Sequence, residues 1–562
     1  MRPTRSHRSM FGGRLALAAV FVAGGLVACQ ESSATPDPDL TFEVGTEEDR
    51  AALFDFLVES TMEWDAFATL PDHPIVRTHP AGLDVPAEMA RYRDDLLAAD
   101  TDSAFYYALL KISNARKDRH LRLGPVEGGL QFPDTFGIEE SQANAPVADS
   151  PVPSAPVILR TDYGDADRRT LFVGDLSEAV AAGAYGPAPA PGDRVVAIQG
   201  RPVAEFAEAV RPYHRYSTDD SFWWWFPYWA TRRTVQIPAR YYGDALELTL
   251  EADDGAEYEV ALPYYAPDEI EWVGHSDRIY PGLSHAPEFF ENETFDLFLP
   301  DDEGLRVVIL QWHGFRRDLP EAIDALLELA GERDLLDAHV IVDATRGAGG
   351  SRGSYAVARL QPERHKGSFG NLMVSEVMER WVEERIDGIR SGRVNPATED
   401  DGSWKLEWLE GDVQRAIQEG RAYTNAVPFK GAHAPPWSDG FIDPAPVHFT
   451  GGLTVWLGPK GGSHLDQFAA QVSDNQLGHI IGMPAGGYSN TWQATETLRF
   501  PTNGRPIVSY QWSMGHSIRP NGQILQYNPA QPDEPFPQTR ENYLDYHAQL
   551  LDLTLERIQG DR

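Results

Sequence analysis

The sequence has very little cysteine and comparatively little positive charge. Cys29 is the single cysteine among 562 residues, so no disulfide can form within the chain. Acidic residues outnumber basic ones by 85 to 48, which gives a net charge of −37 at pH 7. A field of that sign repels phosphate backbones. We therefore expect no nucleic-acid partner.

Several patterns that mark cofactor sites are also missing. The sequence has no HExxH motif, no paired cysteines, no P-loop and no GxGxxG that opens a helix. We therefore predict no obligatory metal or nucleotide cofactor. Beyond the N-terminus, no apolar run approaches the roughly 18 residues that a membrane-spanning helix needs.

Residues 1–28 have the pattern of a secretion signal. An apolar stretch from Leu15 to Ala28 follows four arginines, at positions 2, 5, 8 and 14. The stretch ends in small residues and Cys29, which resembles a bacterial lipobox and implies that Cys29 is lipidated. The alternative is an ordinary signal peptide followed by a chance cysteine. With residues 29–45 as a polar linker, we expect a lipid-anchored protein of the bacterial cell envelope, on its periplasmic or extracellular face.

The length of the chain predicts about three folded units after the linker. Residues 46–125 read as a small helical domain, with one helix from about Glu47 and another from Ser103 to about Lys117. Residues 157–268 form short alternating strands and resemble a PDZ-like domain. Domains of that kind capture peptides by adding a strand to a sheet edge.

The rest of the chain, residues 285–562, alternates strands with helices and predicts an α/β core. Residues 360–445 are charged and irregular, with one helix near 374–390, and read as an insertion in that core.

An aromatic run, FWWWFPYW at residues 222–229, interrupts the PDZ-like segment. It has neither a helical nor a strand period. The run either packs between domains or forms a binding surface for peptide or sugar. The sequence leaves both alternatives open.

One serine, Ser463, lies between a predicted strand and a predicted helix. The segment GPKGGSHLDQF, residues 458–468, follows the apolar run 453–457 and opens an amphipathic helix. Ser463 is either a helix N-cap, with Asp466 as its capping-box partner, or a nucleophile. At a helix N-terminus, free N–H groups can stabilise an oxyanion, and glycines let a substrate approach closely.

The order of the motifs resembles the C-terminal processing, or tail-specific, serine peptidases and their tricorn and chlamydial relatives. Residues 343–350, DATRGAGG, are similar to the Asp-Leu-Arg-x-Asn-Gly-Gly-Gly segment of that family, and residues 458–470 to its nucleophile segment. A helix ending in Asp118-Arg-His120 resembles the N-terminal Asp-Gly-His turn of many members. The resemblance covers residues 46–562 and implies a spiral core of the Clp-protease and crotonase type.

The resemblance also implies roles for individual residues. Ser463 would be the nucleophile, with backbone N–H groups of His464 and of Gly349 or Gly350 holding the oxyanion. The lysine base that many members use is excluded, because residues 464–562 contain no lysine. The base would then be His120, as in the chlamydial type, or His313, as in the tricorn type.

The family's late glutamate falls at Gln526. A glutamine oxygen could orient the imidazole of the base but could not stabilise the imidazolium by charge. The sequence therefore predicts a membrane-anchored serine endopeptidase that acts on polypeptides through an acyl-enzyme. The alternative is a catalytically inactive, peptide-binding lipoprotein that keeps the peptidase fold.

Overall fold

The computed structural model describes residues 42–68, 83–130, 152–234, 236–274, 279–286, 292–301, 305–393, 403–428, 440–489 and 492–560. The predicted signal sequence, the lipidation of Cys29 and most of the linker lie outside the described residues. Residues from Asp39 onward form one compact unit. Within the described ranges, no helix is both long enough and apolar enough to cross a bilayer.

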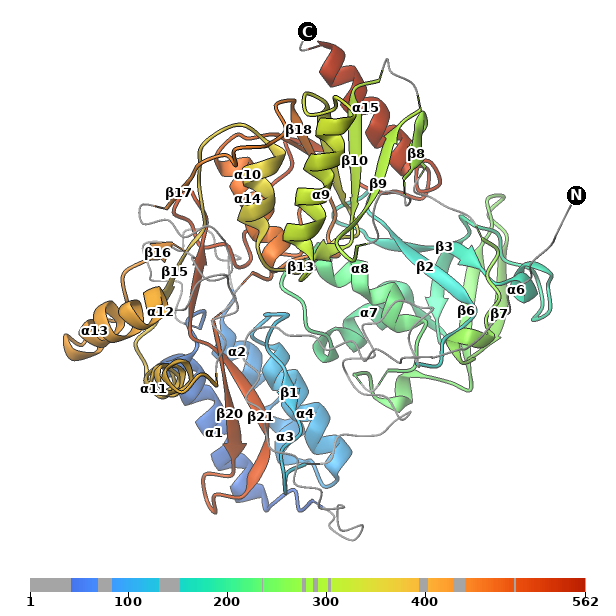
Figure 1. Ribbon diagram of the computed structural model, residues 1–562. Coiled ribbons are helices and arrows are strands. Elements are labelled where there is room, and N and C mark those ends of the chain that lie inside the picture. The colour runs from blue at the N-terminus through green and yellow to red at the C-terminus, as the bar shows by residue number, and fades with distance from the viewer. Residues whose placement is uncertain are drawn as a thin grey trace, which may run out of the picture. The chain divides into compact units, whose positions relative to one another are not determined.

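A seven-stranded sheet lies at the centre of the C-terminal part of the chain (Figure 1). In spatial order its strands are β23 (Glu534–Pro535), β19 (His479–Gly482), β18 (Leu453–Leu457), β12 (His339–Ala344), β10 (Val307–Trp312), β9 (Phe295–Pro300) and β8 (Leu283–His285). The five strands from β23 to β10 run parallel, β9 is antiparallel to β10, and β8 is antiparallel to β9. The predicted α/β core is therefore confirmed as a mixed sheet.

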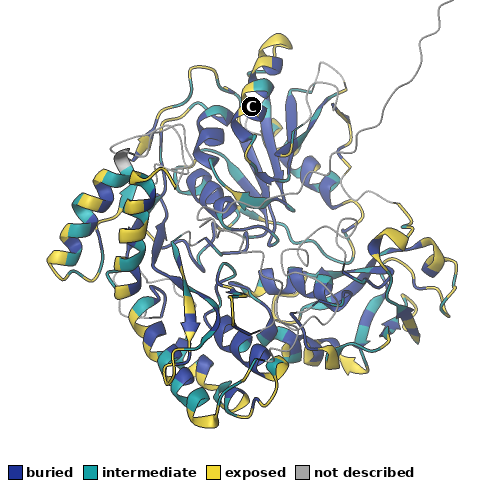
Figure 2. Ribbon diagram, turned by 60° about the horizontal axis from the view of Figure 1, so that its bottom comes forward, coloured by how far each residue is buried: buried dark blue, intermediate teal, exposed yellow. Residues whose placement is uncertain are grey.

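Helices cover both faces of this sheet, which explains why its strands read as continuous apolar runs. The covering helices are α9 (Leu319–Glu332), α10 (Gly353–Leu360), α14 (His464–Asp474) and α15 (Tyr546–Gly560). Val342 and Val455 face the first three helices, whereas Ile341 and Trp456 face α15. Figure 2 shows these central strands as buried.

The N-terminal helices share a hydrophobic core with distant parts of the chain. These helices are α1 (Glu47–Trp64), α2 (Val85–Ala90), α3 (Arg93–Leu97) and α4 (Asp102–Asn114). They pack against the strand pair β20 (Gln493–Arg499) and β21 (Pro506–Ser513) and against helix α11 (Glu376–Arg390). The helices expected at Glu47 and Ser103 and near 374–390 are confirmed. The shared core fixes the end of α4 relative to the C-terminal part of the chain.

A buried ion pair strengthens this connection just after α4. The Arg116 guanidinium lies 3.3 Å from the Asp65 carboxylate and donates to the Gln511 carbonyl oxygen at 2.6 Å. Burial raises the pKa of Asp65, and the Arg116 charge opposes that shift. In turn, the Arg116 carbonyl accepts a hydrogen bond from the Tyr527 hydroxyl at 2.7 Å. The turn after α4, which carries His120, is thus attached to the core at several points.

The segment predicted to be PDZ-like forms an antiparallel sheet. Its strands are β2 (Val157–Asp162), β3 (Thr170–Leu176), β4 (Arg194–Ile198), β6 (Ala245–Glu251) and β7 (Glu257–Pro263), in that order, with β5 (Arg201–Pro202) beside β4. Helices α6 (Glu178–Ala181) and α7 (Val203–Val210) belong to the same segment, and so does α8 (Asp219–Ala230).

The aromatic run lies in helix α8, although its sequence shows neither a helical nor a strand period. Thr218 caps the helix by accepting a hydrogen bond from the Ser221 N–H at 3.3 Å. Most of its aromatic side chains are buried against the β2–β7 sheet, while Trp224 and Tyr228 are half-buried. A helix buried on most sides has no polar stripe, so the sequence shows no amphipathic period.

The remaining elements are short, and most lie in the predicted insertion 360–445 or beside the main sheet. They are β1 (Leu123–Gly124), β11 (Gly314–Phe315), β13 (Ala348–Gly350), β14 (His365–Lys366), β15 (Phe369–Leu372), α12 (Ser403–Trp408), a π-helical turn (Leu409–Val413), α13 (Gln414–Gln418), β16 (Val427–Pro428), β17 (Phe441–Ile442), β22 (Gly515–Ile518) and 3₁₀ turns at Arg211–Tyr213, Ala239–Tyr241 and Pro267–Glu269.

Candidate active site

Ser463 occupies a strained turn between β18 and α14. Its φ is 59° and its ψ is −120°, a combination that costs a non-glycine residue free energy. It precedes the first residue of α14, yet its side chain makes no capping hydrogen bond. The N-cap alternative therefore does not account for this serine. Backbone strain of this kind is concentrated at functional sites, where the surrounding structure maintains it.

Gly349 packs directly against this turn. A Cβ atom added to Gly349 would lie 2.6 Å from the Ser463 Cβ and 3.1 Å from the backbone N of His464. Gly350 differs, because its φ is 148° and an added Cβ would lie 1.9 Å from the Phe315 carbonyl oxygen on β11. Of the two predicted oxyanion glycines, Gly349 is thus the one beside Ser463, and Gly350 packs on Phe315.

The side chain of His464 contacts helix α10, whereas its backbone N–H lies beside Gly349. The ring is buried, and its Nε2 accepts a hydrogen bond from the Gly353 N–H at 2.5 Å. Nε2 must therefore be unprotonated, and the ring caps the N-terminus of α10. The backbone N–H of His464 remains at the start of α14 beside Gly349.

His120 lies in the turn after α4, and its side chain is 21% exposed. Its Nδ1 is 3.7 Å from an Asp118 carboxylate oxygen, which also accepts a hydrogen bond from the His120 N–H at 2.9 Å. Burial lowers the pKa of His120 to about 3, assisted by the charges of Arg122, Arg215 and Arg119. Burial raises the pKa of Asp118 to about 6. Above that pH the ring is neutral and the carboxyl is ionised.

Tyr488 connects His120 with Ser463. The Tyr488 carbonyl oxygen accepts a hydrogen bond from the Ser463 N–H at 2.5 Å. The Tyr488 ring meets the His120 ring edge-on, with 5.4 Å between the centroids. An atom of the same ring would lie 2.5 Å from a Cβ added to Gly462. The fold therefore brings the predicted nucleophile and one predicted base, which are far apart in sequence, into contact with one tyrosine.

Gln526 is buried close by but does not orient His120 as predicted. Its Oε1 accepts a hydrogen bond from the Ser489 N–H at 2.8 Å, and its Nε2 donates to the Ser217 hydroxyl at 3.2 Å. Within the described part of the chain, Nδ1 of His120 has no hydrogen-bond partner. The expected Gln526–His120 hydrogen bond is therefore absent, because backbone and hydroxyl groups engage both ends of the amide.

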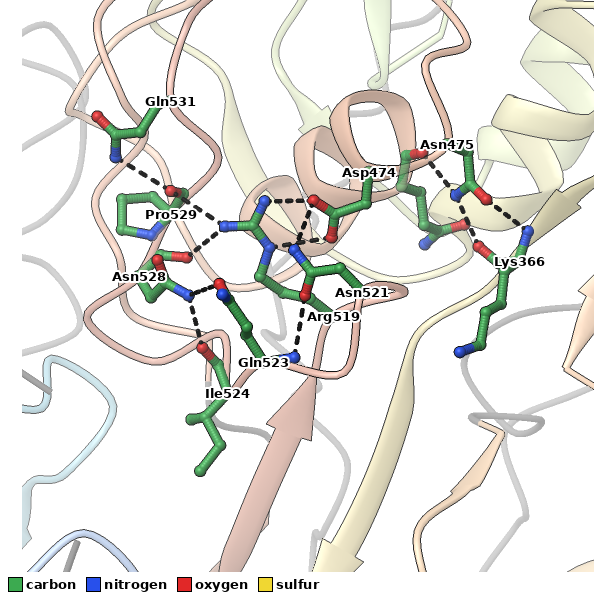
Figure 3. Close-up of polar contacts among 11 residues, drawn as sticks. Lys366, Asp474, Asn475, Arg519, Asn521, Gln523, Ile524, Asn528, Pro529 and Gln531 are labelled. Atoms are coloured by element: carbon green, nitrogen blue, oxygen red, sulfur yellow. Dashed lines mark hydrogen bonds and ion pairs between the residues drawn. The ribbon is translucent and has the colours of Figure 1, made fainter. Parts of the chain in front are cut away.

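The loop that carries Gln526 is fixed to the end of α14 (Figure 3). Arg519 forms a buried, two-pronged ion pair with Asp474, at 2.5 and 3.0 Å. The same guanidinium donates to the carbonyl oxygen of Asn528 at 3.1 Å, and Asn521 donates to Asp474 at 3.0 Å. The C-terminal end of α14 thus anchors this loop, and Ser463 lies just before the N-terminal end of the same helix.

The second predicted base, His313, lies between β10 and β11. Its Nε2 is 3.1 Å from an Asp296 carboxylate oxygen, in an ion pair whose side chains are 38% and 40% exposed. The His313 carbonyl accepts a hydrogen bond from the Ala348 N–H at 2.9 Å. His313 thus belongs to the strand pair that supports Gly349, and its ring is engaged at the surface.

Two residues at this site were not identified as functional from the sequence. Tyr488 carries no motif and directly follows a pair of glycines, Gly486 and Gly487. Asp466 was considered only as a capping partner. Its carboxyl is fully buried and accepts a hydrogen bond from the Gly487 N–H at 3.2 Å. Burial raises the pKa of Asp466 to about 7. Asp466 lies in the first turn of α14 but outside the apolar stripe of Leu465, Phe468, Ala469 and Val472, so the sequence carries no signal for its burial.

Comparison with known proteins identifies the fold but not a family. No family model matches the chain, and no curated protein matches its sequence. Mature CPAF complexed with lactacystin is similar in structure, with a TM-score of 0.60 at 13% identity over 91% of this chain and 98% of that one. Two other solved structures match less well. The photosystem II D1 C-terminal processing protease has a TM-score of 0.38 at 12% identity over 87% of this chain and 93% of that one, and the tricorn protease 0.33 at 11% over 91% and 37%. The chain is thus a mixed α/β protein with a CPAF-like peptidase fold.

Proposed function

We propose that this protein is a serine endopeptidase that cleaves polypeptides through an acyl-enzyme, on a spiral core with a PDZ-like insert. Ser463 is the nucleophile and His120 is the general base. The backbone N–H groups of Gly349 and His464 hold the oxyanion. The observation that carries the proposal is that Tyr488 contacts the backbone of Ser463 and the ring of His120 at once.

Each half of the reaction needs one proton transfer to His120 and one away from it. The Ser463 Oγ attacks the scissile carbonyl carbon while Nε2 of His120 takes its proton. The imidazolium then gives that proton to the leaving amine, and the C–N bond breaks. Water repeats the sequence on the ester and releases the acyl group. Donors fixed by the backbone stabilise the charge that develops on the carbonyl oxygen.

Asp118 supplies the negative charge that Gln526 cannot. Its carboxylate lies 3.7 Å from Nδ1 of His120 and is ionised above a pKa of about 6. A charge at that position stabilises the imidazolium in the transition state. Burial lowers the pKa of His120 to about 3, which makes it a weak base, so stabilisation of the imidazolium during proton transfer is important.

Hydrolysis of an unstructured protein such as casein tests this function. Wild-type protein is expected to cleave it, and Ser463→Ala to lower the rate by about 10⁴-fold or more. Ser473→Ala is the matched control, because Ser473 lies half-buried in the same helix, and it should retain the wild-type rate. Equal rates for wild type and Ser463→Ala would contradict the assignment.

A peptide-binding protein without catalysis is the second candidate. The glutamine at 526 and the absence of a hydrogen bond to Nδ1 of His120, among the described residues, favour it. Binding of polypeptides without turnover, unchanged in Ser463→Ala, would support this candidate. For either function we propose a lipid anchor at Cys29 in the bacterial cell envelope, supported by the sequence pattern of residues 26–29.

A further inference from the structure

Arg119 lies between Asp118 and His120, and its guanidinium is enclosed by aromatic rings. Its Cζ is 4.1 Å from the centroid of a Trp225 ring, 5.5 Å from that of Tyr488 and 5.9 Å from that of Trp229. Trp225 and Trp229 belong to α8, and Tyr488 belongs to the loop after β19. Arginine stacks on aromatic faces through its planar, weakly hydrated cation, most favourably where water is excluded.

The backbone of Arg119 is held as firmly as its side chain. Its guanidinium donates to the carbonyl oxygen of Arg215 at 3.3 Å, and the Arg215 guanidinium donates to that of Arg119 at 3.0 Å. The Arg119 N–H donates to the Ser217 hydroxyl at 3.3 Å. This reciprocal pair of hydrogen bonds fastens the turn before His120 to the segment that leads into α8.

The same segment also contacts the loop beside the nucleophile. The Thr218 hydroxyl, which caps α8, donates to the Gly486 carbonyl oxygen at 3.2 Å. The Gly486 N–H in turn donates to the Gly461 carbonyl oxygen at 2.5 Å, two residues before Ser463. The Arg119 cage thus joins the turn of His120, helix α8 and the glycine turn of Ser463.

We propose that Arg119 is a positioning residue, whose enclosure by Trp225, Trp229 and Tyr488 holds the ring of His120 in register with Ser463. Through α8, this assigns the aromatic run a function in the active site rather than in binding peptide or sugar. The inference rests on the proposed function for its kinetic consequences. Its structural part, the fixed position of the His120 ring, can be tested without activity.

Two substitutions separate the stacking of Arg119 from its charge. Arg119→Lys keeps the charge but loses the planar group and most of its donors. Arg119→Met loses the charge and keeps an apolar chain against Trp225. Both variants are expected to lower kcat at least 10-fold while KM changes less than 2-fold, because a positioning residue acts on the ring of His120 and not on the binding of substrate. A uniform loss of folded protein would lower the apparent kcat without moving a pH profile.

The pH profile separates the two variants. The Arg119 charge contributes to the low pKa of His120. Arg119→Met is therefore expected to move the acidic limb of the kcat/KM profile that reports His120 to higher pH, and Arg119→Lys is expected to leave it in place. Arg201→Met is the matched control, because Arg201 is an exposed arginine that also lies near an aromatic ring, 5.9 Å from that of Tyr241. It belongs to β5, beside the β2–β7 sheet against which α8 packs. It should change neither kcat nor the profile.

Carbethoxylation of His120 by diethyl pyrocarbonate, mapped by peptide mass spectrometry in a Ser463→Ala background, measures the position of the ring directly. Both Arg119 variants are expected to react at least fivefold faster than the parent at pH 7, because a released ring becomes more exposed. Trp225→Phe keeps an aromatic wall and should react at close to the parent rate. If an Arg119 variant fails to fold, Trp225→Leu replaces it, with the same expected acceleration.

The outcomes distinguish the two proposals. Wild-type protein that hydrolyses nothing, together with faster carbethoxylation in the variants, would overturn the proposed function and support the positioning of His120. Active wild-type protein whose kcat and carbethoxylation rate are the same in both Arg119 variants would overturn the inference and leave the proposed function intact.

Discussion

Replacement of His120 by glutamine is expected to lower kcat/KM by about 10⁴-fold, the upper range for loss of a general base. Glutamine keeps a polar group of similar size but cannot take the Ser463 proton at neutral pH. The ring of His120 meets Tyr488 at 5.4 Å, and Tyr488 accepts the Ser463 N–H. Steady-state hydrolysis of a fluorogenic peptide measures the effect.

His313→Gln is the control for this substitution, because His313 is the other histidine that the resemblance allows. Its ring pairs with Asp296 in a partly exposed position, so its removal is expected to change the rate less than threefold. An active His120→Gln variant together with an inactive His313→Gln variant would reverse the assignment of the base. In that case the ring of His313 would have to leave Asp296 during turnover.

Substitution of Gly349 by alanine is expected to lower kcat by about 10²- to 10³-fold, the effect of losing one oxyanion donor. The new Cβ would lie 2.6 Å from both the Gly462 carbonyl oxygen and the Ser463 Cβ. Both neighbours belong to the strained turn, so neither moves without displacing the nucleophile. The Gly349 N–H would shift by a large part of an ångström, enough to misalign it with the oxyanion.

Gly411→Ala serves as the control, because an added Cβ at Gly411 would meet no atom within 4 Å. It should retain the wild-type rate and melting temperature. Comparing kcat with thermal unfolding for both variants separates a damaged site from a damaged fold. A Gly349→Ala variant with wild-type kcat would show that Gly349 does not border the reacting atoms.

Strand β18 could be predicted from the sequence to the residue. It matches the apolar run 453–457, because a short apolar run bounded by glycine has few alternatives. Helix α8 could not be predicted in this way. Its own side chains are aromatic and most of them are buried, so the sequence lacks the periodic contrast between polar and apolar faces on which the prediction depends.

The site was only partly predictable, for a related reason. Ser463 is marked by Gly461 and Gly462, and the structure explains both: a Cβ added to Gly461 would clash with the Gly347 carbonyl oxygen, and one added to Gly462 would clash with the Tyr488 ring. The choice between Gly349 and Gly350 depends on which one faces the turn, and no pattern within the glycine run encodes that. The partners of Gln526 are a backbone N–H at 489 and a hydroxyl at 217, both distant in sequence. Contacts of that kind depend on tertiary packing, which a single sequence does not specify.

The central claim is that the hydroxyl of Ser463 is an activated nucleophile. Reaction of the folded protein with a fluorophosphonate, followed by digestion and mass spectrometry, tests it most directly. We expect one phosphonylated residue, Ser463, and loss of that labelling in both Ser463→Ala and His120→Gln. Folded wild-type protein that takes up no label, or that is labelled at another serine with equal efficiency in Ser463→Ala, would contradict it.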